Sequence, residues 1–217
     1  GGAARGENLF HSFKDFNIGE GRGAYFANPD GIANILSRVT GKNPSTILGK
    51  LGVLGNANLF LINPAGILFG QNASLDVKGS FVGTTADSVV FGDGFEFSAS
   101  DPSAPPLLTI NIPNGLRFRD NPGDIVNRSV ANGNSALFVP KGKTLALIGG
   151  NVNFDGGEVF AFGGRIELGG LTQAGIVTLN DGFSVSFPDD VTRADLSLTN
   201  NSLVDVSNDG GGTINVN

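Results

Sequence analysis

The chain has 217 residues, of which 40% are hydrophobic and only 16% are charged, and its net charge is −6. This composition excludes a disordered chain and is too poor in charge for a typical helical surface, while the length is sufficient for one domain with a sizeable core. The acidic balance and the lack of a basic cluster argue against nucleic acid as a partner, and the absence of Cys excludes disulfides and a Cys nucleophile.

The first third of the chain predicts short strands between Gly and Asn-Pro turns. Ala57–Ile62 has the length of an ordinary strand. Ile32–Val39 is the one helix-like stretch of note, although it is too short to be stable alone. In Asn63-Pro64-Ala65-Gly66, Pro presets φ, Asn caps through its side chain and Gly allows the chain to leave, so this tetrapeptide predicts a β-turn. We expect that turn to be a surface loop.

The middle of the chain interrupts the rhythm of strands. Asp101–Pro106 contains three prolines, which excludes it from any central strand. Residues 115–127 are polar and contain another Pro. We interpret the region from about 98 to 127 as an excursion from the main fold, with a hairpin formed by Leu107–Ile112 and Leu116–Phe118.

The second half predicts a parallel β-helix. Thr144–Ile148 and Phe183–Phe187 are strand-like, and Asn151–Phe154, Glu158–Phe162 and Arg165–Leu168 alternate between Gly-rich turns, a rhythm that Thr172–Leu179 continues. Three short strands with Gly corners make a coil of roughly 20–25 residues, and stacked coils form a right-handed parallel β-helix. A β-propeller or β-sandwich remains the rival fold, because Asn-Gly and Asp-Gly hairpin signals also occur.

The same alternation predicts which side chains enter the core of the coils. We expect Phe154, Phe162 and Leu168 to point inward, and Glu167 to lie on the surface. The 17 Phe residues are expected to stack mainly as a core ladder, because exposed sugar-binding surfaces favour Trp and Tyr.

Residues that could carry chemistry are few. His11 is the only His, and its strand-like surroundings favour a packed or capping role over a catalytic one. Asp189 and Asp190 are adjacent beside a Pro, which indicates a solvated corner and not a paired catalytic site. Gly149–Asp155 lacks the third Gly of a calcium-binding repeat and does not recur. We therefore predict neither catalytic residues nor a metal site.

Three runs in the first third resemble a known family. V-T-G-K-N-P-S at Val39–Ser45, G-K-L-G-V-L-G at Gly49–Gly55 and N-P-A-G-I at Asn63–Ile67 are similar to the secretion domain of two-partner secretion exoproteins of the filamentous haemagglutinin type, also called the haemagglutination activity domain. The resemblance implies one secretion domain over residues 1–217, at the N-terminal end of a larger exoprotein. It also implies a β-helix whose first coil is capped by strands over residues 8–18 and which carries extra-helical sheet elements.

The resemblance also supplies candidate recognition residues. Family members commonly have two motifs, N-P-N-L and N-P-N-G-I. The second corresponds to Asn63, Pro64, Ala65, Gly66 and Ile67, with Ala in place of the second Asn. The first has no identical copy: Asn28, Pro29, Asp30, Gly31 and Ile32 stand at its place, and Asn56, Asn58 and Leu59 are a poorer match. These residues have two possible roles. They form turns that only serve folding, or they shape a surface or a folding step that export requires, and both roles can hold together.

The function implied by the resemblance is export without chemistry or cofactor. The partner would be an outer-membrane β-barrel transporter whose periplasmic POTRA domains capture an extended strand, such as the uncharged, amphipathic run Asn58–Ile62. The resemblance implies that the chain passes through the periplasm to the cell surface and acts as a monomer. We do not expect it to enter the membrane, since no apolar run approaches the ~20 residues of a membrane span. A carbohydrate-active β-helix enzyme and a glycan-binding adhesion module remain the alternatives.

Overall fold

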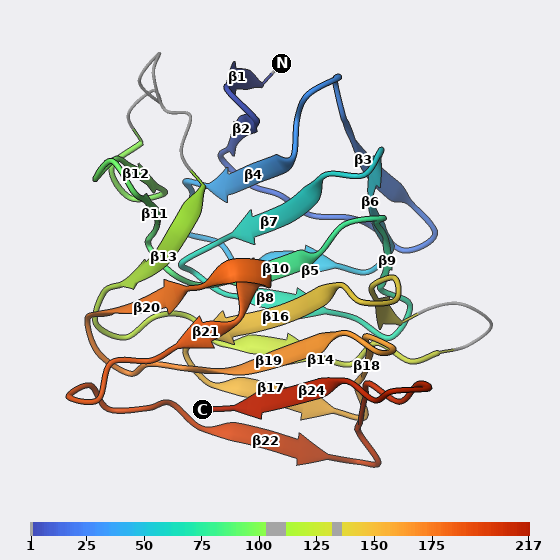
Figure 1. Ribbon diagram of the computed structural model, residues 1–217. Coiled ribbons are helices and arrows are strands. Elements are labelled where there is room, and N and C mark those ends of the chain that lie inside the picture. The colour runs from blue at the N-terminus through green and yellow to red at the C-terminus, as the bar shows by residue number, and fades with distance from the viewer. Residues whose placement is uncertain (1, 103–111, 132–135) are drawn as a thin grey trace.

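The chain winds into a parallel β-helix of stacked, three-sided coils (Figure 1). The structure is a computed structural model that describes residues 2–102, 112–131 and 136–217. Parallel pairing joins successive coils along two sides and, on the third side, within two separate three-stranded sheets, so the predicted β-helix is confirmed. Within the described residues, no helix combines the length and apolar character needed to cross a membrane.

The longest side is sheet A, which runs the whole length of the stack. Its strands, in spatial order, are β1 (Ala3–Arg5), β2 (Asn8–Phe13), β4 (Asn34–Val39), β7 (Asn58–Ile62), β10 (Phe81–Thr84), β16 (Thr144–Gly149), β19 (Arg165–Gly170) and β24 (Thr213–Val216). Only β1 is antiparallel to its neighbour, β2. β1 and β2 form a hairpin at the N-terminal end of sheet A. Of the capping strands implied over residues 8–18, residues 8–13 form β2, while Ile18 makes only an isolated bridge to Ile47.

The other two sides are built from shorter strands. Sheet B contains β5 (Ser45–Ile47), β8 (Ile67–Phe69), β14 (Ile125–Asn127), β17 (Val152–Asp155) and β22 (Leu196–Thr199). The third side, called side C here, contains β3 (Gly23–Ala27), β6 (Lys50–Leu54), β9 (Ser74–Asp76), β15 (Leu137–Phe138), β18 (Glu158–Phe160) and β23 (Leu203–Asp205). Each coil passes from sheet A to sheet B and then to side C.

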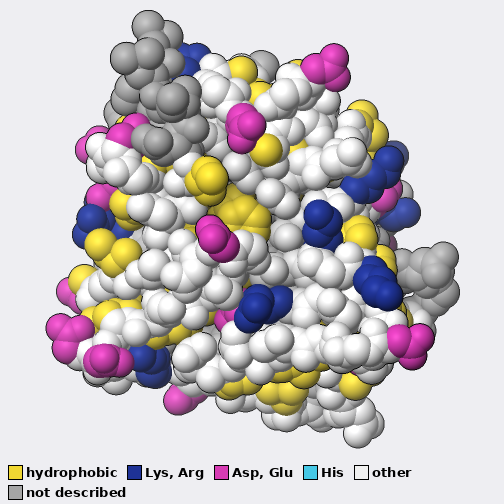
Figure 2. All heavy atoms as spheres, in the orientation of Figure 1, with side chains coloured by type: hydrophobic (Ala, Val, Ile, Leu, Met, Phe, Trp, Pro, Cys, Tyr) yellow, Lys and Arg dark blue, Asp and Glu magenta, His cyan; other side chains and the backbone are white. Residues whose placement is uncertain are grey.

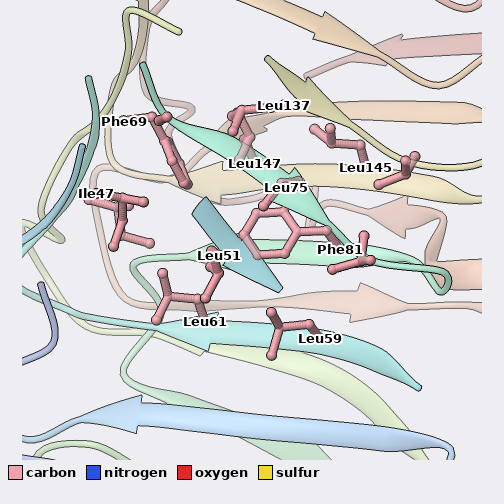
Figure 3. Close-up of a cluster of buried hydrophobic side chains, with 14 of the residues drawn as sticks. Ile47, Leu51, Leu59, Leu61, Phe69, Leu75, Phe81, Leu137, Leu145 and Leu147 are labelled. Carbon is pink, nitrogen blue, oxygen red and sulfur yellow. The ribbon is translucent and has the colours of Figure 1, made fainter. Parts of the chain in front are cut away.

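The coil length matches the length predicted from the sequence. Ile35 pairs with Leu59, which pairs with Phe81, and Leu145 pairs with Ile166, so neighbouring coils are offset by 24, 22 and 21 residues. Inward side chains of the three sides meet in one core: Leu59, Leu61 and Phe81 from sheet A, Ile47 and Phe69 from sheet B, and Leu51, Leu75 and Leu137 from side C (Figure 3). Stacking each coil thus buries a further apolar layer, and this burial stabilises the fold by ~25 cal/mol per Å² of apolar surface removed from water.

Two excursions leave the stack and form a separate antiparallel sheet. The first, after β10, supplies β11 (Ser88–Phe91), β12 (Glu96–Ser98) and β13 (Pro113–Phe118), and the second, after β19, supplies β20 (Gly175–Leu179), the 3₁₀ turn η1 (Asp181–Phe183) and β21 (Val185–Ser186). β13 pairs with β11 on one side and with β20 on the other. We call this the extra-helical sheet.

The excursions differ from the sequence-based expectation in two respects. The first begins directly after β10 rather than near residue 98, and Gly175–Leu179 belongs to the second excursion instead of continuing the coils. Leu116–Phe118 is a strand as predicted, whereas residues 107–111 of its proposed hairpin partner lie outside the described residues. Alternation alone cannot separate a coil strand from an extra-helical strand, because both are half-buried.

The extra-helical sheet packs on the outer face of sheet A and creates a second apolar core. Phe10, Leu36, Phe60, Val82, Ala146 and Ile148 point outward from sheet A, and Val89, Leu116, Phe118 and Val177 face them. The Phe ladder is therefore only partly correct: Phe69, Phe81 and Phe154 lie inside the coils, but Phe10, Phe60, Phe91, Phe97, Phe118 and Phe183 belong to the second core.

Three further expectations are corrected by the structure. Ile32–Val39 is not helical, because residues 34–39 form β4 and are buried on both faces between the two cores. Phe162 points outward and contacts Phe138 and Phe160, while Val159 and Ala161 fill the core position. Glu167 is completely buried, since its outward side lies beneath the second excursion. Phe154 and Leu168 point inward as predicted.

Candidate functional site

The Asn63–Ile67 segment forms the corner between sheets A and B. Gly66 N–H donates to Asn63 O at 3.0 Å, and Gly66 has a φ of 124°, so the predicted β-turn is confirmed. The Asn63 side chain is fully buried: its Nδ2 donates to Asn43 O at 3.1 Å and to Ser45 Oγ at 3.0 Å, and its Oδ1 accepts from Ala65 N–H at 3.0 Å. The expectation of a surface loop is therefore wrong for this side chain.

Three Asn-Pro pairs are stacked at this corner in successive coils. Asn43-Pro44 lies on one side of Asn63-Pro64 and is held by the bonds from the Asn63 amide. Asn121-Pro122 lies on the other side, where Gly123 N–H donates to Pro64 O at 2.9 Å. A Cβ on Gly123 would collide with the Ala65 backbone, so the coils approach closely here. The corner is a built structural element: within Asn63–Ile67 only Pro64 and Ala65 are partly exposed, whereas the flanking Asn43, Pro44 and Asn121 are exposed.

The segment proposed as the first motif lies at a different corner, between side C and sheet A. Ile32 N–H donates to Pro29 O at 3.2 Å, and Gly31 has a φ of 79°, so the turn begins at Pro29, one residue later than in Asn63–Gly66. Asn28 Oδ1 accepts from Ala57 N–H at 2.9 Å in the next coil. Pro29, Asp30 and Gly31 are exposed.

Asn56, Asn58 and Leu59 lie beside that first turn. Asn58 Nδ2 donates to Asn34 Oδ1 at 2.9 Å, Asn34 Nδ2 donates to Asn8 Oδ1 at 3.1 Å, and Ser80 N–H donates to Asn58 Oδ1 at 2.9 Å. This amide ladder joins the first strands of sheet A. Leu59 is buried in the coil core, and Asn56 is exposed. The structure thus brings the two first-motif candidates together and leaves Asn63–Ile67 at the opposite end of β7.

β7 connects the two corners and is apolar on both faces. Leu59 and Leu61 enter the coil core, while Phe60 and Ile62 lie under the extra-helical sheet, each with at most 1% exposure. β4 and β10 occupy both edges of the strand. The prediction that this uncharged strand is amphipathic is therefore wrong, because the extra-helical sheet covers the face expected to be exposed. In the folded domain, neither an edge nor a face of β7 is available to a partner.

Sequence reasoning missed several residues that build this region. Asn43 and Ser45 hold the Asn63 amide, although the sequence marks them only as part of the Val39–Ser45 run. The recurrence of Asn-Pro at residues 43, 63 and 121 is the signal that could have identified the stacked corner. The unequal spacing concealed it, because the first excursion separates the second and third copies.

The residues considered for chemistry take structural positions. His11 packs against Phe13 and Phe26 with ring centroids 6.1 and 5.1 Å away, and burial lowers the pKa of its imidazole. Asp189 and Asp190 occupy an exposed turn. Across the described residues, no three His, Cys, Asp or Glu side chains gather in a way that could hold a metal ion.

The Gly149–Asp155 segment takes part in contacts between coils. Asn151 Oδ1 accepts from Asp195 N–H at 3.1 Å, and Asn153 Oδ1 accepts from Ser197 Oγ at 2.8 Å in the next coil. Asp155 pairs with Arg128 at 3.0 Å. These oxygens thus join neighbouring coils.

Comparisons with known proteins agree with the fold. A model of the TPS secretion domain family matches residues 1–216. Two curated Haemophilus influenzae proteins, each called heme/hemopexin-binding protein, are 40% and 37% identical over 72 and 75 residues, which is 33% and 35% of this chain but only 8% of each relative. The solved HMW1 secretion domain from Haemophilus influenzae has a TM-score of 0.61 and 24% identity, and the match covers this whole chain and 52% of that structure.

Proposed function

The chain belongs to the TPS secretion domain family, the domain through which two-partner secretion targets a large exoprotein for export by a partner transporter, and on that premise we propose how the partner recognises it. The transporter captures the chain as an extended strand, before the domain folds. Burial of β7 carries this proposal: its apolar side chains and both of its edges are inaccessible once the coils have stacked.

β7 suits capture in the unfolded chain. Asn58–Ile62 is uncharged and rich in strand-forming residues. Such a segment can add as a new strand to an exposed sheet edge, where main-chain hydrogen bonds give affinity. POTRA domains in the periplasm would provide that edge. Coil stacking then competes with capture for the same strand, so that folding at the cell surface releases the chain from its partner.

The two Asn-rich corners act in this scheme through folding. Asn63 is buried and holds two neighbouring turns, so its side chain serves the folded corner. Asn58 and Asn28 connect neighbouring coils in the same way. We propose that the motifs promote the stacking of the first coils, and that the domain acts as a monomer without catalytic activity or cofactor.

Two matched variants separate capture from folding. Leu61→Asp in β7 and Phe154→Asp in β17 each introduce a carboxylate into the coil core, where Leu61 is 1% and Phe154 0% exposed, so both should prevent folding. Binding of each chain to the purified periplasmic part of the transporter is then measured. We expect Phe154→Asp to be captured at least as well as the wild type and Leu61→Asp to be captured poorly. Equal capture of the two variants would refute β7 as the recognised strand.

A further inference from the structure

The second excursion, residues 171–195, is connected to the coils by a narrow neck. Leu171 and Arg193 form an antiparallel bridge, and Thr172 N–H donates to Thr192 O at 3.1 Å. Ala194 N–H donates to Gly170 O at 2.9 Å and returns the chain to the stack. The two ends are thus held together independently of the strands between them, and β19 and β22 keep their pairing partners among the coils.

The far end of this segment covers the outer face of sheet A. Phe183 packs edge-on against Phe60, with ring centroids 5.2 Å apart and an interplanar angle of 85°. Gly182 O accepts a hydrogen bond from Thr144 Oγ1. Beneath lies an apolar strip of outward side chains on neighbouring strands: Phe60, Ile62, Val82, Ala146 and Ile148. Figure 2 shows only separate hydrophobic patches on this face, because the extra-helical sheet covers the strip.

The cover is under local backbone strain. Gly182 and Phe183 are consecutive residues with φ of 68° and 60°. A left-handed conformation is ordinary for Gly, but it is unfavourable for a bulky residue such as Phe. Phe183 keeps it because its ring is seated on Phe60 and only 9% exposed. Release of that ring would relieve the strain, which offsets part of the cost of opening.

We infer that residues 171–195 form a clasp that opens and closes as a unit while the coils remain stacked. Beyond the neck, β20 pairs with β13, Asn121 N–H donates to Thr172 O at 3.1 Å, and Ala174 N–H donates to Asp120 Oδ1 at 2.8 Å. On the side of sheet A, the attachments are the burial of Val177 and Leu179 in the second core, the Phe183–Phe60 contact and the bond to Thr144. Opening it exposes the part of the apolar strip beneath it, around Phe60, and one edge of β13, without breaking any pairing between coils. The folded domain therefore has an apolar surface around Phe60 that it can show or hide.

Hydrogen exchange followed by mass spectrometry tests the clasp in the intact domain. In the unmodified protein at low urea concentrations, we expect the amides of β20 and β21 to exchange by an opening of lower free energy than those of β7 and β16. Phe183→Gly removes the ring and the strain together. It should speed exchange in β20 and β21 by about tenfold or more and leave β7 and β16 unchanged.

Ile176→Ala is the matched control, because Ile176 is on the same excursion but is 38% exposed on the side away from the strip. It should leave exchange in the clasp close to that of the wild type. If β7 and β16 open together with β20 in the unmodified protein, the molecule is one cooperative unit and the inference fails. It also fails if Phe183→Gly speeds exchange no more than Ile176→Ala does.

Discussion

Asn63→Ala should destabilise the folded domain strongly, even though Asn63 lies in a turn. The substitution removes three hydrogen bonds and leaves Ser45 Oγ, Asn43 O and Ala65 N–H without the partner that satisfies them. A buried polar group left unsatisfied costs about 1–3 kcal/mol. Ser45 is fully buried, whereas Asn43 is exposed and its carbonyl can turn to water. We therefore expect a total loss of about 2–4 kcal/mol, a large share of the ~5–15 kcal/mol typical of domains.

Urea unfolding followed by circular dichroism measures this loss, with Asn28→Ala as the control. Asn28 is also followed by Pro, and its side chain also makes three hydrogen bonds, with Ala57 N–H, Ile32 O and Pro29 O. It is only half-buried and the turn beside it is exposed, so water can replace part of what the substitution removes. Its free energy of unfolding should fall by about 1 kcal/mol. The reasoning is refuted if Asn63→Ala costs no more than Asn28→Ala, because the stacked corner would then contribute nothing beyond an ordinary turn.

Three further outcomes are expected. Phe154→Asp should abolish folding, whereas Phe162→Asp should lower the free energy of unfolding only by the loss of its outward ring contacts. Urea unfolding of the two variants measures this difference, and similar losses would contradict the assigned register. Burial raises the pKa of Glu167 more than its contacts with Asn215 and Arg165 lower it, so the folded state holds this proton more tightly and stability falls as pH rises from the ordinary value of 4.5 towards neutrality. Glu167→Gln should therefore be more stable than the wild type at neutral pH, with the advantage shrinking on acidification, and an advantage that grows in acid would reverse the argument. The isolated domain should not degrade any polysaccharide in a product assay; turnover that disappears on a single Asp→Asn change would show an active site.

Local alternation predicted the inward face of several coil strands but not what covers the coils, and the choice of a β-helix over a propeller or sandwich rested mostly on the family resemblance. Val152 and Phe154, and Ile166 and Leu168, alternate inward as expected, because the interior of a coil is made by side chains a few residues apart. The alternation in the sequence of Arg165–Leu168 predicts a half-exposed strand, and it would be the same whether or not another segment covers the outer face. Glu167 is buried by a segment that returns from the second excursion, and nothing within β19 encodes that return.

The choice of inward face also fails where a strand carries apolar residues on both sides. In Glu158–Phe162, large Phe residues alternate with Val159 and Ala161, and the smaller residues fill the core. Hydrophobicity alone favours Phe162, whereas the space inside the coil favours Ala161. For the candidate site, the sequence predicted that Asn63–Gly66 is a β-turn, but the burial of the Asn63 amide depends on Asn43 and Ser45 in the preceding coil.

Both excursions leave the β-helix at the same corner, after β10 and after β19, and return to sheet B. The coil between them, through β16 and β17, crosses that corner directly through Gly149-Gly150-Asn151. Hydrogen bonds between coils continue on either side of each departure, and closing a longer loop adds little entropy cost. The corner therefore works as an insertion port. What emerges at the two departures can be lengthened or exchanged without disturbing the stack. The direct crossing between them must stay short, because Gly150 N–H donates to Gly123 O at 3.0 Å and Asn151 O accepts from Ile125 N–H at 2.8 Å.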